Sequence, residues 1–110
     1  VLARLAPSAV VVADADRVVG SAAAVDQGAT ALVLDDAFQH RRAGRHLDVV
    51  LISADASDEV WQVLPAGPLR EGRVGLRRAG LILITRKVAT PDIVDRVIVS
   101  VRDDAPSVPV

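Results

Sequence analysis

The sequence predicts an α/β protein in which helices flank a sheet of parallel strands. Short apolar runs of strand length alternate with helical or loop stretches, which is the pattern of such folds. Apolar residues make up 51% of the chain, and Phe38 and Trp61 are its aromatic residues. A core built almost entirely from Val, Leu, Ile and Ala suits strands that are buried on both faces, as parallel strands are.

The first half of the chain contains the pattern strand, helix, strand. A helix is expected after Asp14 or Asp16, either of which can cap it, and it should end near Gly28. Pro7 precedes the first expected strand, and the pair Asp35-Asp36 follows the second. Over the whole chain, β-branched and apolar runs predict four strands, at residues 8–13, 30–34, 48–53 and 81–85.

The second half continues with a loop, a strand and a helix. Two glycines and two prolines make residues 54–73 mostly loop, and a short helix should end at Arg78. A longer helix is expected from Pro91, with Thr90 as its cap, to about Asp104. The β-branched run 97–101 is also compatible with a strand, and residues 105–110 with an edge strand.

Length and charge limit the functional classes. A chain of 110 residues is about one small domain, and we expect a single α/β segment that is part of a larger domain. The net charge of −1, without a basic stripe interleaved with aromatic residues, gives nucleic-acid binding no support. The chain has no Cys for a disulfide framework or a thiolate metal site. No apolar run approaches the ~18–20 residues that span a bilayer, so this segment itself should be soluble.

Two acids, Asp35 and Asp36, directly follow the second expected strand. Adjacent carboxylates repel each other unless a cation neutralises them, and ligands gather beyond the carboxyl ends of parallel strands. This arrangement suits carboxylates that hold Mg²⁺ beside a nucleotide phosphate. Taken alone, the pair fits equally well a strand end that is merely solvated. Gln39 and His40 follow, and each can bond a phosphate or a metal-bound water; alone, His40 fits a solvated loop histidine better.

The segment Leu64–Glu71 is a stiff loop that contains two prolines and a glycine and presents Arg70 beside Glu71. A guanidinium on a rigid loop is suited to clamping a phosphate oxygen. Glu71 can orient Arg70 or contact the metal, but from the residues alone a surface ion pair fits Glu71 better, while both readings stay open for Arg70. The basic residues Arg77 and Arg78, and the pair 86–87 after the last strand, are expected to be solvated.

Two of these segments together resemble the lipid A 4′-kinase (tetraacyldisaccharide 4′-kinase) family. Residues 33–42 are similar to the family's Asp-Asp-Gly-Phe-Gln-His motif, and residues 64–71 to its Leu-Pro-Ala-Gly-Pro-Leu-Arg-Glu motif. Residues 47–52 match the strand that comes next, and residues 76–86 a later Leu-Arg-Arg-Ala stretch. Ala37 stands where the family usually has Gly, and Gly72 where it usually has Pro, which indicates a divergent member.

The resemblance implies a P-loop-NTPase-like (Rossmann-like) fold and a kinase bound to the cytoplasmic face of the Gram-negative inner membrane. Such kinases transfer the γ-phosphoryl of ATP, with Mg²⁺, to the 4′-hydroxyl of tetraacyldisaccharide 1-phosphate in lipid A biosynthesis. It implies that Asp35 and Asp36 manage Mg²⁺, with His40 also at the catalytic centre. By the same resemblance, Gln39, Arg70 and Glu71 lie on the nucleotide and phosphate side of the site.

The chain contains no G-x-x-x-x-G-K-[ST] phosphate-binding loop and no Met. We therefore expect an internal fragment whose natural N-terminus, with that loop and the membrane-anchoring segment, lies upstream of Val1, and which is inactive alone. The alternative from another class is a non-catalytic α/β nucleotide- or ligand-binding module that has lost the kinase chemistry. A receiver-like phosphoacceptor domain fits poorly, because the chain offers no clear phosphoacceptor Asp with a Lys partner at suitable strand ends.

Overall fold

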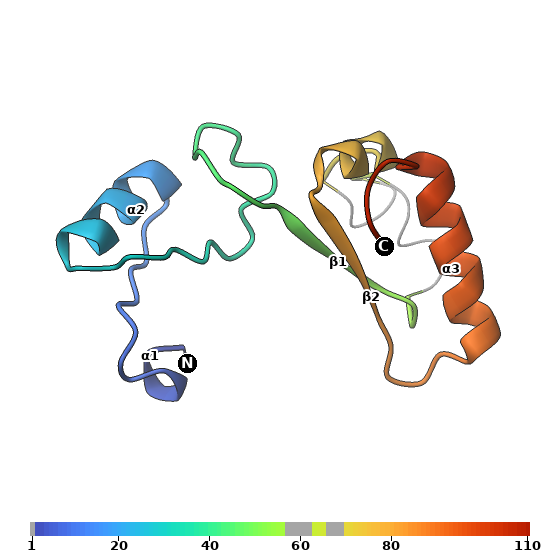
Figure 1. The fold of residues 1–110 in the computed structure, drawn as a ribbon, viewed down its shortest axis with the longest axis horizontal. Coiled ribbons are helices and arrows are strands. Elements are labelled where there is room, and N and C mark those ends of the chain that lie inside the picture. The colour runs from blue at the N-terminus through green and yellow to red at the C-terminus, as the bar shows by residue number, and fades with distance from the viewer. Residues whose placement is uncertain (1, 57–62, 66–69) are drawn as a thin grey trace. The chain divides into compact units, whose positions relative to one another are not determined.

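The computed structural model describes residues 2–56, 63–65 and 70–110, and it divides into two compact units, residues 1–45 and 46–110 (Figure 1). The strands lie in the second unit, and each unit is built around its own local contacts. Within the described residues, no helix is both long and apolar enough to cross a membrane.

The first unit contains the helices α1 (Leu2–Leu5) and α2 (Arg17–Asp26). Helix α2 begins where the sequence predicts, because the Asp16 carboxylate accepts hydrogen bonds from the backbone N–H groups of Val18 and Val19. An N-cap of this kind satisfies amides that have no partner inside the helix. The chain turns away from α2 at Gly28, whose φ of 92° lies in the left-handed region that glycine adopts without strain.

The predictions of strands at residues 8–13 and 30–34 are wrong. Both segments are irregular and form no hydrogen-bonded ladder. Their valines and leucines are largely exposed, and Val33 is 97% exposed. A strand requires a neighbour that satisfies its backbone N–H and C=O groups, and β-branched composition supplies only a preference for extended backbone.

The second unit is a mixed α/β structure around a two-stranded parallel sheet. Strand β1 (Val49–Ser53) pairs with β2 (Leu81–Thr85) in the register Val49 to Leu81 through Ser53 to Thr85. The 3₁₀ helix η2 (Arg73–Arg78) leads into β2, and α3 (Pro91–Asp104) follows it. Figure 1 shows α3 running along one side of the sheet. The predictions of a strand at 81–85 and of a helix from Pro91 are confirmed, and residues 97–101 are helical.

The core of the second unit lies between β2, α3 and the end of the chain. Ile82 and Val101 are fully buried, and Ala105 and Val108 are also buried. The backbone N–H of Ile82 donates to the carbonyl of Pro109 at 2.9 Å. The terminal residues therefore supply a backbone partner to β2, but they remain irregular, and the edge strand considered for 105–110 is not formed.

Two arginines of η2 attach it to α3. The guanidinium of Arg73 donates to the carbonyl and the hydroxyl oxygen of Ser100 and pairs with Asp104. Arg77 donates to the carbonyl oxygen of Asp104 at 2.8 Å. Arg77 is exposed, as predicted, and its guanidinium also satisfies a carbonyl at the end of α3 that has no partner within the helix.

Candidate functional site

The acids Asp35 and Asp36 lie in a tight turn, and both are exposed. Asp36 has a φ of 49°, in the left-handed region, and Asp is one of the few non-glycine residues that adopts it readily. Ala37 is buried and does not have a positive φ, so Ala is accommodated at this position. The residue that carries the unusual backbone conformation is therefore the second acid itself.

The loop that follows the acids is held by its own backbone and by Arg45. The N–H of His40 donates to the carbonyl of Ala37 at 2.9 Å, and the N–H of Ala43 donates to the carbonyl of His40 at 3.1 Å. The Arg45 guanidinium donates to the carbonyls of His40, Ala43 and Phe38, at 2.7, 3.1 and 3.4 Å. Arg45 thus fixes the loop that carries Gln39 and His40.

Sequence reasoning did not identify Arg45 as a functional residue. The available signal was weak: a basic residue directly after Gly44, at the end of a loop whose carbonyls lack a regular partner. Five N–H donors in a fixed fork let one arginine serve several such carbonyls.

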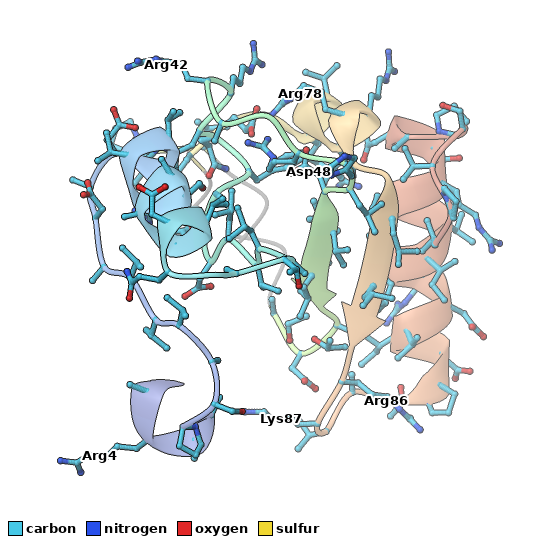
Figure 2. All side chains as sticks on the ribbon, turned by 60° about the vertical axis from the view of Figure 1, so that its left-hand side comes forward. Arg4, Arg42, Asp48, Arg78, Arg86 and Lys87 are labelled. Atoms are coloured by element: carbon cyan, nitrogen blue, oxygen red, sulfur yellow. The ribbon has the colours of Figure 1, made fainter. Side chains whose placement is uncertain are left out.

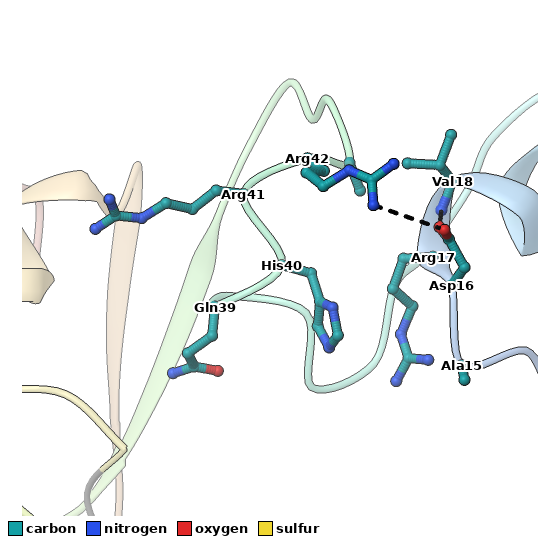
Figure 3. Close-up of a pocket in the computed structure, with 9 residues that line it drawn as sticks. Ala15, Asp16, Arg17, Val18, Gln39, His40, Arg41 and Arg42 are labelled. Atoms are coloured by element: carbon teal, nitrogen blue, oxygen red, sulfur yellow. Dashed lines mark hydrogen bonds and ion pairs between the residues drawn. The ribbon is translucent and has the colours of Figure 1, made fainter.

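A pocket of about 560 Å³ lies beside this loop, within the first unit (Figure 3). It is lined by residues 15–18 at the start of α2 and by residues 39–43. Arg17, Arg41 and Arg42 contribute positive charge, and Asp16 contributes the acid of the lining. Gln39 and His40, both predicted as site residues, belong to this lining. A pocket with this excess of cationic groups suits an anionic ligand.

Asp16 is held in its charged form at the edge of this pocket. The pKa of its carboxyl is lowered from the ordinary 3.8, first by the backbone N–H of Val18 and then by that of Val19. The positive charges of Arg42, whose guanidinium lies 4.0 Å from the carboxylate, and of His40 act in the same direction. Figure 3 shows Arg42 directed at Asp16, while Arg41 extends away from it. The Asp16 carboxylate therefore caps the start of α2 and also pairs with Arg42 of the loop.

The arginine-bearing loop is described only in part, because residues 66–69 of its motif lie outside the described residues. Arg70 is exposed and Glu71 is half-buried. Both carboxylate oxygens of Glu71 accept from the Arg78 guanidinium at 2.8 Å, and this pairing raises the pKa of Arg78. Arg78 is exposed, as expected for a solvated residue, and its ion pair with Glu71 was not predicted.

The predicted site residues are thus described in two groups. Asp35, Asp36, Gln39 and His40 occupy consecutive turns of the first unit. Arg70 and Glu71 belong to the second. The described residues contain no group of three or more His, Cys, Asp or Glu side chains that could hold a metal ion. The donor set at 35–36 is two exposed carboxylates, and Mg²⁺ in nucleotide sites commonly uses one or two carboxylates with phosphate oxygens and water. This donor set fits Mg²⁺.

The fold and the basic pocket describe a segment of an α/β protein suited to an anionic ligand, and comparison with known proteins identifies its family. A model of the tetraacyldisaccharide-1-P 4′-kinase family matches residues 1–105. The chain belongs to this family.

Curated relatives carry the same name. The chain is 48% identical over 86 residues, 77% of its length, to the tetraacyldisaccharide 4′-kinase of Anaeromyxobacter sp. (strain Fw109-5). It is 57% identical over 53 residues, 48% of its length, to that of Chlorobaculum tepidum. The chain covers 23% and 15% of these two relatives, so it spans about a quarter of their length or less. No solved structure matches the chain.

Proposed function

We propose that the complete gene product containing this chain is a lipid kinase. It transfers the γ-phosphoryl group of ATP to the 4′-hydroxyl of tetraacyldisaccharide 1-phosphate, in lipid A biosynthesis. The observation that carries the proposal is the family match over residues 1–105, which includes both the Asp35-Asp36 segment and the Arg70-Glu71 segment. The names of the curated relatives support the same activity.

Within this proposal, Asp35 and Asp36 hold Mg²⁺, and Gln39 and His40 lie beside the nucleotide phosphates. Bound Mg²⁺ would neutralise negative charge on the β- and γ-phosphates. The positive pocket beside Gln39 and His40 supports this placement, because three arginines line it. The Arg45 hydrogen bonds restrain this loop, and a restrained loop loses less entropy on binding.

Arg70 and Glu71, in the second unit, have a proposed phosphate-binding role, which the family match over residues 1–105 supports. The Glu71 carboxylate already pairs with Arg78, so its first role is to fix the backbone beside Arg70. An exposed guanidinium at a fixed position can bind a phosphate oxygen and stabilise the charge that develops during transfer. In this proposal Arg70 contacts the phosphate, and Glu71 holds the backbone beside Arg70 in place.

The rest of the catalytic apparatus is proposed to lie in a larger kinase domain of P-loop type, of which residues 1–110 are one α/β segment. The chain contains no G-x-x-x-x-G-K-[ST] loop, and phosphoryl transfer in P-loop kinases depends on that cradle. We therefore expect the 110-residue chain alone to be inactive. The complete protein would act at the cytoplasmic face of the inner membrane, where its lipid substrate resides.

The direct test incubates the complete gene product with γ-labelled ATP, Mg²⁺ and tetraacyldisaccharide 1-phosphate in detergent micelles. Label should appear on the 4′-hydroxyl of the lipid, and a lipid acceptor already phosphorylated at that position should remain unlabelled. ATP binding by a folded protein without transfer to the lipid would overturn the proposal in favour of a non-catalytic nucleotide-binding module.

A further inference from the structure

A carboxylate beyond β1 collects three backbone N–H groups from the loop that follows β2. Asp55 lies two residues after the end of β1, and its carboxylate oxygens accept from the amides of Lys87 at 2.6 Å, Val88 at 2.9 Å and Ala89 at 2.6 Å. Consecutive amides that converge on one point form a nest for an anion. Here the chain fills the nest with its own side chain.

The position of Asp55 is itself well determined. The Asp55 amide donates to the hydroxyl of Ser53 at 3.2 Å, and the Ala54 amide donates to the carbonyl of Thr85 at 2.8 Å. Ser53 and Thr85 are paired at the end of the parallel ladder. The carboxylate is therefore attached to the sheet, and the loop is attached to the carboxylate.

The charged form of Asp55 is favoured in this arrangement. Its pKa is lowered, above all by the N–H of Val88, with further contributions from Ala89, Lys87 and the Ser53 hydroxyl. The three hydrogen bonds from the amides of residues 87–89 to Asp55, the Asp55 clamp, are therefore present at neutral pH. Hydrogen bonds to a charged acceptor are stronger than those to a neutral one.

The clamp fixes the backbone of Lys87 but leaves its side chain available. No hydrogen bond or ion pair within the described residues involves the Lys87 ammonium group, and the residue is exposed. The neighbouring Arg86 instead donates to the carbonyl of Ala89 at 3.4 Å and so folds back onto its own loop. Figure 2 shows both residues where the chain passes from β2 to α3. Of the two cations, Lys87 is the one presented to a ligand.

We propose that Asp55 is a positioning residue that holds the loop after β2 so that Lys87 binds a phosphate group of a substrate. This inference rests on the proposed kinase function and adds to it a contact at the carboxyl ends of β1 and β2, where ligands of parallel sheets bind. The shared chemistry is a phosphate oxyanion, which belongs either to ATP or to the 1-phosphate of the lipid. Lysine is suited to it as a compact point charge.

The test compares Lys87→Gln, Asp55→Asn and the double variant in the complete gene product, with KM measured separately for ATP and for the lipid. Loss of one charged contact should raise KM for one of the two substrates by about 10-fold or more and reduce kcat less. That substrate identifies the source of the phosphate. Asp55→Asn should raise the same KM by a smaller factor, and the double variant should match Lys87→Gln, because Asp55 acts through Lys87.

Asp95→Asn is the matched control, since Asp95 is an exposed acid of α3 with no bond to a neighbour within the described residues. It should leave both KM values unchanged. An unchanged KM for both substrates in Lys87→Gln, with turnover intact in the parent protein, would overturn this inference and leave the kinase assignment standing. A KM in the double variant that rises by the product of the two single-variant factors would also overturn the inference. Such a product is expected if Asp55 acts independently of Lys87.

Two further measurements decide the inference if the parent protein transfers no phosphate. Hydrogen exchange of the amides of Lys87, Val88 and Ala89 should accelerate in Asp55→Asn and not in Asp95→Asn; unchanged protection would overturn the clamp. Equilibrium titration with ATP and with the lipid phosphate should show weaker binding of one of them by Lys87→Gln. Equal binding of both by the variant and the parent would overturn the role of Lys87.

Discussion

Glu71 and Arg78 form a two-pronged ion pair in which each carboxylate oxygen accepts from one terminal guanidinium nitrogen at 2.8 Å. The pair joins the end of the arginine-bearing loop to the last turn of η2. Gly75 makes it possible, because a Cβ at that position would lie 2.6 Å from Glu71 Oε2. The motif that resembles a kinase signature therefore also closes a local structure.

The first prediction concerns this pair. Arg78→Ala should lower the free energy of unfolding by about 1 kcal/mol, because both partners are partly exposed and solvent screens them. Arg78→Lys should recover part of this loss, since an ammonium group keeps the charge and loses the fork. Chemical denaturation measures both. Gly75→Ala should break the pair by displacing the flexible Glu71 side chain, while Arg102→Ala, an exposed arginine of α3, should have little effect. Equal stability of the Arg78 and Arg102 variants would contradict the prediction.

The second prediction concerns Arg45 and the loop beside the pocket. Arg45→Ala removes the donor that serves three carbonyls, and it should destabilise the protein by about 1–3 kcal/mol. Hydrogen exchange should show faster exchange at the amides of His40 and Ala43, which bond within this loop. Arg41→Ala is the control, because Arg41 is an exposed arginine of the same loop that bonds to none of these carbonyls. Matching exchange rates in the two variants would show that Arg45 does not order the loop.

The third prediction concerns pH and Asp16. The pKa of its carboxyl in the folded protein is lowered from 3.8, so the stabilisation is fully present above 3.8 and is lost as pH falls through the lower folded value. Acid titration followed by NMR should show the amide shifts of Val18 and Val19 moving together, with a midpoint below 3.8. Asp16→Asn keeps a capping oxygen without a titrating charge, so these shifts should stay flat in that variant. A midpoint at or above 3.8 in the parent protein would contradict the prediction.

The sequence predicts those elements whose signals are local. Asp16 caps α2 as expected, Pro91 opens α3, and the strand 81–85 has the expected bounds. In each case the decisive chemistry lies within one turn or one run of residues: an oxygen that bonds nearby amides, a fixed φ, or continuous apolar character. The predicted mixed α/β class is also confirmed, because the structure contains a two-stranded parallel sheet and helices.

The parts that could not be predicted depend on partners distant in sequence. The runs 8–13 and 30–34 resemble strands in composition, yet a ladder forms only where a second strand meets the first. The three hydrogen bonds that Asp55 accepts come from amides more than thirty residues away in the sequence, so no local pattern predicts them. Nothing in the sequence near Arg78 indicates that it pairs with Glu71. The roles of Asp35, Asp36 and His40 remain predictions that turnover measurements must test.

The most direct test of the account is the turnover of Asp36→Asn beside the parent protein, in the complete gene product with ATP, Mg²⁺ and tetraacyldisaccharide 1-phosphate. Asn tolerates the left-handed backbone of Asp36, so this variant should keep the fold and lose only the carboxylate charge. The account predicts a turnover lower by orders of magnitude with an unchanged melting temperature. Turnover equal to that of the parent protein would contradict the assignment of the Asp35-Asp36 turn as the metal-binding part of a kinase site.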